Sequence, residues 1–210
     1  DWGYFAFVYD TQQLPEPPSS FEELINSPDD LKIIIQDPRT STPGLGLLLW
    51  MHSVYGDIAP AKWEQLNNKI LATTQSWSDG YFSLFMNGEA PMILSYSTSP
   101  AYHMAVDKTD RYQAVQFEEG HYLQVEVAAL VESSKQKTLA RSFLDFMLTP
   151  EFQEHIPLKN VMYPAIDLGD DLPRVFDRLI TPEPTFFLPP AEVAKKRRQL
   201  VNDWLDAMTR

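Results

Sequence analysis

The chain of 210 residues is acidic, with 17 Lys and Arg against 29 Asp and Glu and a net charge of −12. Its length and its 44% of hydrophobic residues predict a globular protein with a sizeable core, and the acidic balance argues against nucleic acid as a partner, because phosphate binding needs basic patches. The absence of Cys excludes disulfides, thiolate chemistry and Cys-ligated metal sites.

The first expected element is a buried strand over residues 3–9. The chain has no initiating Met and enters this strand almost at once, so we expect an upstream part of the protein to be missing. A capping box of Ser19 and Glu22 predicts a short helix from Phe21 to Asn26. Three isoleucines at 33–35 then predict a second buried strand.

A polar segment, QDPRTSTPGLG at 36–46, separates this strand from an apolar run at 47–51, which is the order strand, loop, helix. Thr42 suits an N-cap and Pro43 suits the first turn of a helix over 43–55. A helix start leaves backbone N–H groups unpaired, and the Ser and Thr hydroxyls beside them could complete a cradle for an anion or another acceptor. On its own, the pattern favours an ordinary capped helix.

Three further elements are expected in the middle of the chain. A helix over 60–70 would carry Trp63, Leu66 and Ile70 on one face, and a second helix would begin at Ser78 and close at Asn87-Gly88. Residues 91–96 predict a strand, which Ser99-Pro100 would follow with a new helix.

The last third of the chain begins with a β-rich stretch at 122–131. Residues 138–148 predict an amphipathic helix with four side chains turned inward, those of Leu139, Phe143, Phe146 and Met147. A final helix is expected over 191–208. Short strands that alternate with helices predict an α/β fold with a mainly parallel sheet.

Two strand-to-helix junctions share one chemistry, TSTP at 40–43 and STSP at 97–100. Ligands of α/β sheets bind beyond the carboxyl ends of the strands, where such junctions lie. Tyr96 and Tyr102 flank the second junction, and Trp77 stands between two serines before another helix start. Aromatic faces can stack on a flat charged ligand or hold a cationic ring, at about 0.5–2 kcal/mol each. Each tyrosine could equally belong to the core, whereas the polar neighbours of Trp77 favour a site.

Signals for catalysis, metals and cofactors are poor. The four His residues lack the spacing of a metalloprotease helix, and the sequence contains no nucleophile elbow and no nucleotide-binding loop. The Asp37-Pro38-Arg39 segment is better explained as a brace for its own loop than as reactive chemistry. We therefore predict no catalytic residue, no metal site and no cofactor.

Four segments, 4–10, 36–51, 94–103 and 119–129, together resemble the thiamine-binding periplasmic proteins of bacterial ABC importers, and the resemblance extends over the whole chain. It implies a two-lobed type II periplasmic binding fold, an α/β fold with a mainly parallel sheet and flanking helices. This chain would supply one near-complete lobe and part of a second, and an upstream lobe of the same protein would complete it.

The same resemblance implies how the chain divides. Residues 1–9 would be a crossing strand, 10–118 the second lobe, 119–165 a return to the first lobe, and 166–210 C-terminal helices that pack on the second lobe.

Carried over position by position, the resemblance implies these ligand-binding residues: Ser41, Trp77, Tyr96, Ser97, Thr98, Ser99 and Tyr102. The hydroxyls and helix-start N–H groups would hold a hydroxyethyl or phosphate end, and the aromatic rings would face the thiazolium and pyrimidine rings. One position departs from the family, because Val161 stands where relatives carry a stacking Trp. A valine cannot stack, which leaves the affinity and the ligand preference open.

The implied function is a periplasmic, monomeric binding protein that captures thiamine, or its mono- or diphosphate, and delivers it to an ABC transporter permease without making or breaking a bond. Two alternatives stay open. One is a binding protein of the same fold for an oxyanion, a polyamine or ferric iron, for which Tyr96 and Tyr102 could be ligands. The other is a pyrimidine-synthesis enzyme on the same scaffold, against which the His and Cys inventory argues.

Overall fold

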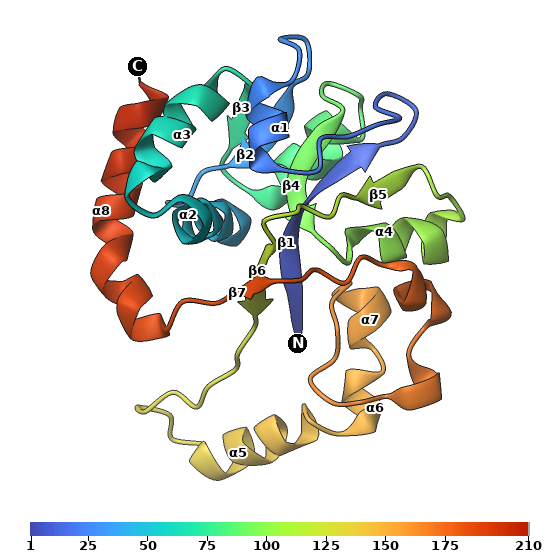
Figure 1. The fold of residues 1–210 in the computed structure, drawn as a ribbon. Coiled ribbons are helices and arrows are strands. Elements are labelled where there is room, and N and C mark those ends of the chain that lie inside the picture. The colour runs from blue at the N-terminus through green and yellow to red at the C-terminus, as the bar shows by residue number, and fades with distance from the viewer. Residues whose placement is uncertain (210) are drawn as a thin grey trace.

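Strand β1 (Trp2–Asp10) runs through the middle of the computed structural model, which describes residues 1–209 (Figure 1). The sheet has the order β3-β2-β4-β1-β6-β7, and β5 also pairs with β1. Its other strands are β2 (Ile33–Gln36), β3 (Ile70–Thr74), β4 (Met92–Tyr96), β5 (Tyr112–Ala114), β6 (His121–Val125) and β7 (Thr185–Phe186). The strands predicted at 3–9, 33–35 and 91–96 are confirmed.

The pairing makes the sheet mixed. Strand β2 is parallel to β3 and β4, and β6 is parallel to β7, as expected for an α/β fold. Strand β1 is antiparallel to β4, β5 and β6, so every antiparallel pair of named strands involves this one strand. The parallel pairs β2–β3 and β2–β4 bring three carboxyl ends to the same edge of the sheet.

Side chains alternate between the two faces of the sheet. Phe5 and Phe7 of β1 join the larger core cluster, whereas Val8 joins a smaller one on the other face. The larger cluster is covered by α1 (Phe21–Asn26), α2 (Thr42–Tyr55), α3 (Ala59–Asn67) and α8 (Pro190–Met208). A π-helical segment, Asp79–Phe85, covers the smaller cluster with Tyr81 and Phe85.

Most of the remaining elements lie near the turn that follows β4 or beyond the end of β1 that carries the N-terminus (Figure 1). They are α4 (Ser99–Tyr102), the π-helical segment His103–Asp107, α5 (Lys137–Phe146), α6 (Pro150–Gln153), α7 (Ile156–Lys159) and 3-10 turns at Gly56–Ile58, Gly169–Asp171 and Arg174–Arg178. Helix α5 lies apart from the sheet layers (Figure 1).

Helix α5 corrects one expectation. Leu139, Phe143 and Phe146 were expected to face inward, yet they are 68%, 54% and 48% exposed. The periodicity of the helix is amphipathic as predicted, but no layer within residues 1–209 covers its apolar face. The pattern therefore predicted the helix and its apolar side correctly, but the expectation that this side is buried was wrong.

Two boundaries and one strand also differ from the sequence analysis. Helix α3 ends at Asn67, and Ile70 begins the unpredicted strand β3, which pairs in parallel with β2. Every second residue of β3 is exposed, so its pattern is too short and too polar to stand out. The β-rich stretch at 122–131 forms a strand only to Val125, which pairs with Trp2 of β1.

Helix caps are shifted by one residue. Ser20, not Ser19, caps α1, and its Oγ accepts a hydrogen bond of 3.0 Å from the N–H of Glu23. The Glu23 carboxylate accepts in turn from the N–H of Ser19 at 2.8 Å, so the reciprocal bond goes to the residue before the cap and the predicted box of Ser19 and Glu22 is replaced by Ser20 and Glu23. Ser41, not Thr42, is the N-cap of α2, and its side chain makes no capping bond.

A close backbone approach at Gly44 fixes the start of α2 against the end of β2. A Cβ atom there would overlap the carbonyl oxygen of Gln36 and lie 2.8 Å from that of Asp37. We expect Gly44→Ala to lower the free energy of unfolding by about 1–3 kcal/mol, because backbone cannot yield as a flexible side chain can. Urea unfolding of both proteins measures this difference. Equal stability of Gly44→Ala and the wild type would contradict the expectation.

Among residues 1–209, no helix has both the length and the apolar character needed to cross a membrane. Arg210, the last residue of the segment predicted at 166–210, lies outside the described residues.

Candidate functional site

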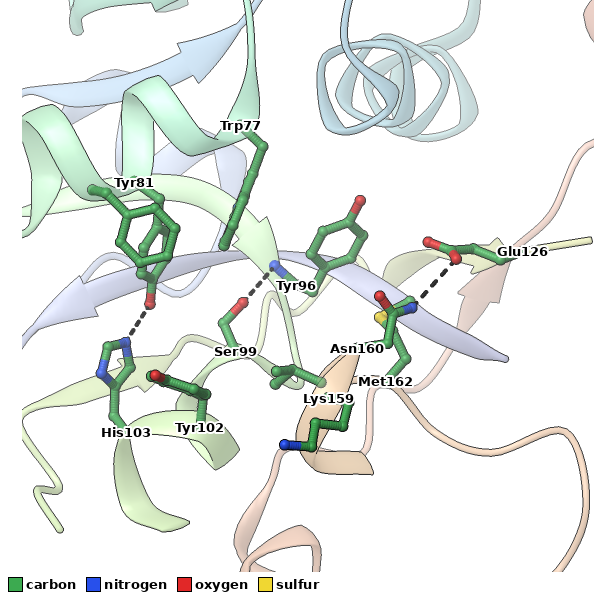
Figure 2. A pocket seen from close by; sticks show the side chains of 12 residues that line it. Trp77, Tyr81, Tyr96, Ser99, Tyr102, His103, Glu126, Lys159, Asn160 and Met162 are labelled. Atoms are coloured by element: carbon green, nitrogen blue, oxygen red, sulfur yellow. Dashed lines mark hydrogen bonds between the residues drawn. The ribbon is translucent and has the colours of Figure 1, made fainter. Parts of the chain in front are cut away.

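A cavity of about 430 Å³ opens where β4 ends and α4 begins (Figure 2). Its lining residues are Trp77, Tyr81, Phe82, Tyr96, Ser99, Tyr102, His103, Glu126, Lys159, Asn160, Val161 and Met162. Four of the seven residues predicted to bind ligand line this cavity, namely Trp77, Tyr96, Ser99 and Tyr102. Side chains from four separate stretches of sequence thus meet at one hollow.

A hydrogen bond at the ring edge and aromatic contacts at the ring face hold the indole of Trp77 in place. It lies at the start of the helical turn that follows β3 and leads into the π-helical segment, and its indole Nε1–H donates to the Oγ of Ser95 at 2.8 Å. Its ring stacks on Tyr81 with centroids 4.8 Å apart, and Phe82 meets it edge-on at 5.4 Å. These contacts leave the indole half-buried and fixed at the cavity wall.

Ser99 presents a hydroxyl at the start of α4. Its Oγ lies 2.8 Å from the Oγ of Ser95 and accepts from the N–H of Tyr96 at 3.4 Å. Pro100 follows it in the first helical turn, as the sequence predicted. The hydroxyl is therefore part of a small network that reaches from the cavity to the indole of Trp77.

Tyr96 lies at the end of β4, and its ring packs 5.3 Å from Phe5. Burial raises the pKa of Tyr96 well above its ordinary value, and the charge of Glu126 adds to this. The phenol is consequently neutral at physiological pH. Tyr102, on α4, is 37% exposed at the mouth of the cavity.

The other three predicted residues do not line the cavity. Ser97 is fully buried, and its N–H donates to the carbonyl of Tyr4 at 2.8 Å. Thr98 is also fully buried, and its Oγ1 lies 3.6 Å from the Sδ of Met162. Both residues hold the β4–α4 turn in place rather than face the hollow. Ser41 stands at the N-cap of α2 and is half-buried.

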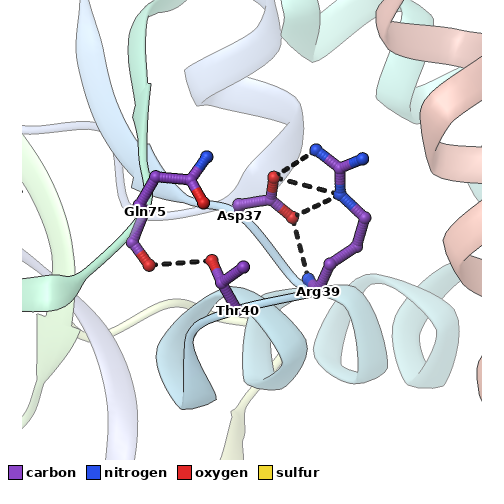
Figure 3. Close-up of polar contacts among 4 residues, drawn as sticks. All are labelled: Asp37, Arg39, Thr40 and Gln75. Carbon is purple, nitrogen blue, oxygen red and sulfur yellow. Dashed lines mark hydrogen bonds and ion pairs between the residues drawn. The ribbon is translucent and has the colours of Figure 1, made fainter.

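The loop after β2, which carries Ser41, is tied to the short link between β3 and Trp77 (Figure 3). Thr40 donates through Oγ1 to the carbonyl of Gln75 at 2.8 Å. Asp37 accepts from Arg39 at 2.9 Å (Nε) and 2.5 Å (Nη2), and these hydrogen bonds lower the pKa of Asp37. The predicted brace of Asp37 and Arg39 is confirmed.

Sequence reasoning missed Tyr81 and His103. The Tyr81 hydroxyl lies 2.8 Å from Nε2 of His103, and Nδ1 of His103 lies 2.7 Å from the carboxylate of Asp107. Burial lowers the pKa of His103 against the opposing effect of Asp107, so the ring is neutral at pH 7. A carboxylate can only accept, so Nδ1–H donates to Asp107, and Nε2 accepts from Tyr81. The spacing of four between Trp77 and Tyr81 was the signal available.

The opposite wall of the cavity comes from Glu126, which follows β6, and from residues 159–162 at and after the end of α7. Asn160 Nδ2 donates to Glu126 at 3.3 Å and to Asp1 at 3.1 Å. Val161 has a φ of 57°, a left-handed conformation that is rare for a β-branched residue. Glu126 and Lys159 bring one charge of each sign to this wall. No sequence motif pointed to Glu126, Lys159 or Asn160, whereas the family resemblance had singled out Val161.

The arrangement suits binding of a flat organic molecule. Aromatic rings line one side, and a hydroxyl and charged groups lie within the same hollow. Within residues 1–209, no three His, Asp or Glu side chains are grouped so that they could hold a metal ion.

The model of the bacterial extracellular solute-binding protein family matches residues 1–196. The chain belongs to this family. Within the family, it is 54% identical over 210 residues to a protein of Brucella abortus biovar 1 (strain 9-941) named thiamine-binding periplasmic protein, and the match covers 100% of this chain and 63% of that relative. The chain thus spans less than two thirds of the length of the curated relatives that it matches.

A solved structure of a periplasmic thiamin binding protein superposes with a TM-score of 0.95 at 51% identity, and the match covers 100% of this chain and 65% of that one. The apo ferric ion-binding protein A of Pasteurella haemolytica, at 13% identity and a TM-score of 0.78, covers 98% of this chain and 67% of its own, and shows the same fold alone. The family members are binding proteins rather than enzymes, and the predicted periplasmic binding protein fold is confirmed.

Proposed function

We propose that the protein captures thiamine in the periplasm and delivers it to the permease of an ABC importer. The single observation that supports this best is the cavity in which Trp77, Tyr96 and Tyr102 surround the hydroxyl of Ser99. Such a hollow provides faces for two flat rings and a hydrogen-bonding group for a polar end. The names of the 54%-identical and 51%-identical relatives support the same ligand and the same compartment.

In this proposal, the chain supplies one wall of the site, and an upstream lobe of the same protein closes over it. The divisions at 1–9, 10–118, 119–165 and 166–210 remain predictions, as does the monomeric state. The apolar face of α5 is uncovered and the cavity is open on one side, as expected if the upstream lobe packs against both.

The positive thiazolium ring finds aromatic faces and a carboxylate in this hollow. Trp77 and Tyr96 offer ring faces, and Glu126 offers a negative charge on the opposite wall. Val161 adds an aliphatic surface there but no ring to stack on. We therefore place most of the stacking energy on Trp77.

Calorimetric titration of the full-length protein with thiamine tests the proposal. We expect saturable 1:1 binding of thiamine, and no comparable heat or colour on addition of ferric ion in a separate titration. Binding of ferric ion with loss of thiamine binding would replace the proposal by an iron carrier. Release of new products from thiamine or pyrimidine precursors, followed by mass spectrometry, would indicate an enzyme instead.

A second expectation concerns the phosphates of thiamine. Ser41 stands at the start of α2 and Ser99 at the start of α4. Ser41→Ala and Ser99→Ala should weaken thiamine monophosphate by about 1.5–3 kcal/mol and thiamine by about 0.5–1.5 kcal/mol, since hydrogen bonds to charged groups are the stronger ones. Parallel titrations of each variant with both ligands measure the difference, and equal losses would mean that these junctions do not hold the phosphate.

A further inference from the structure

Ser95 is a fully buried polar residue that lies behind the cavity rather than in it. It precedes Tyr96 on β4 and pairs with Ala6 of β1. Its side chain shares a face of the sheet with Ile93, which belongs to the smaller apolar cluster. A hydroxyl in such surroundings is costly unless its hydrogen-bonding groups are satisfied, so its partners reveal its role.

The hydrogen bonds around Ser95 have a direction that follows from its partners. An indole N–H can only donate, so the bond of 2.8 Å from Trp77 uses the Ser95 oxygen as acceptor. The proton of Ser95 then needs an acceptor of its own, and the oxygen of Ser99 lies 2.8 Å away. The hydrogen bonds therefore run in one direction, with Trp77 donating to Ser95 and Ser95 donating to Ser99.

Ser99 is the last residue of this hydrogen-bond series, and the same reasoning gives the direction in which its hydroxyl proton points. Its oxygen accepts from Ser95 and also from the N–H of Tyr96 at 3.4 Å. Both of its lone pairs are thus used inside the protein, and its O–H is left for the cavity that Ser99 lines. The network turns Ser99 into a hydrogen-bond donor.

We propose that Ser95 is a positioning residue that holds the indole of Trp77 at the cavity wall and directs the Ser99 hydroxyl as a donor toward an oxygen of the ligand. This rests on the proposed function, in which that oxygen belongs to the hydroxyethyl or phosphate end of thiamine. One buried side chain would thereby set both the stacking face and the polar contact of the site.

The indole is fixed from its other side as well, so Ser95 acts in a rigid setting. Tyr81 stacks on Trp77, and the hydroxyl of Tyr81 is anchored on His103. Loss of the Ser95 oxygen leaves the indole stacked but without an acceptor for its N–H. The structural consequence is therefore local, which makes the variant informative.

The test compares Ser95→Ala, Ser99→Ala and the double variant in the full-length protein. We expect Ser95→Ala to weaken thiamine binding about tenfold, since a buried donor loses its acceptor and Ser99 loses its orientation. The double variant should lose less affinity than the two single losses added together, because both changes remove the same oriented Ser99 hydroxyl. Losses that simply add would overturn the proposal.

A readout without ligand separates this proposal from the proposed function. The indole N–H resonance of Trp77, assigned by its absence in Trp77→Phe, should move upfield in Ser95→Ala as its hydrogen bond is lost. The control Ser53→Ala, which removes a hydroxyl bonded to the Leu49 carbonyl on α2, should change neither the resonance nor the affinity. An unchanged Trp77 resonance in Ser95→Ala would overturn the network.

Misfolding of the variant and absence of thiamine binding are two further outcomes that the experiment covers. If Ser95→Ala does not fold, Ser95→Cys replaces it, because a thiol keeps the bulk but accepts hydrogen bonds weakly. If the wild type binds no thiamine, the proposed function fails, and the role of Ser95 then stands or falls with the Trp77 resonance alone.

Discussion

Trp77→Ala should weaken thiamine binding to the full-length protein by about 1–3 kcal/mol, through lost stacking and lost buried area. The indole lines the cavity and is held by Ser95 and Tyr81, so it is already in place before ligand arrives. A ligand that stacks on it need not order the side chain, which keeps the whole contact energy available for binding. Calorimetric titration with thiamine measures the change.

Two comparisons sharpen this result. Trp77→Phe keeps an aromatic face but lacks the N–H, so we expect a loss between those of the wild type and the alanine variant. Phe82→Ala, at a residue that is 50% exposed and meets the indole edge-on, should cost less than Trp77→Ala. Wild-type affinity in Trp77→Ala would remove the indole from the site.

Asp10→Ala should lower the free energy of unfolding by about 3 kcal/mol, at the low end for breaking a buried pair because Arg111 stays partly exposed. The Asp10 carboxylate is buried at the end of β1 and accepts from Arg111 at 2.8 Å (Nε) and 2.6 Å (Nη2). It also accepts from the N–H of Gln12 at 3.0 Å. Removing it leaves Arg111 without its partner and opens the turn that follows the strand.

Urea unfolding of the wild type, Asp10→Ala and Asp110→Ala measures this difference. Asp110 forms a comparable pair with Arg178, but both side chains are more than half exposed, at 63% and 55%. That control should change stability by less than about 1 kcal/mol. Equal effects of the two substitutions would contradict the importance assigned to burial.

The same pair predicts a pH dependence. Burial alone would raise the pKa of Asp10, but hydrogen bonds from Arg111 and Gln13 outweigh it and hold the pKa below its ordinary value of 3.8. A carboxyl group whose pKa is lowered in the folded state stabilises the protein fully at pH values above its ordinary pKa. This stabilisation disappears as the pH falls through the folded-state pKa. The gap in stability between the wild type and Asp10→Ala should therefore narrow in acid.

Local sequence signals sufficed for much of the fold. The apolar runs that became β1, β2 and β4 are buried on both sides, so their hydrophobicity is continuous and visible. Strand β3 is exposed at every second residue and depends on its pairing with β2, which no local pattern reveals. The exposure of α5 was equally hidden, since an amphipathic pattern predicts an apolar face and not what covers it.

The site divides in the same way. Trp77, Tyr96, Ser99 and Tyr102 stand beside strand ends and helix starts, so chain order and chemistry could indicate them. Ser97 and Thr98 share that chemistry but are fully buried in the β4–α4 turn, where they contact Tyr4 and Met162 and do not line the cavity. Glu126 and Asn160 reach the cavity only through packing of β6 beside the segment after α7, a tertiary contact between residues 34 positions apart.

Native mass spectrometry of the full-length protein, as isolated from cells that contain thiamine, tests the proposed function most directly. A bound mass equal to thiamine or one of its phosphates is expected, and Trp77→Ala should retain less of it. Isolation with bound ferric ion or another solute in its place, or failure to retain added thiamine, would contradict the proposal.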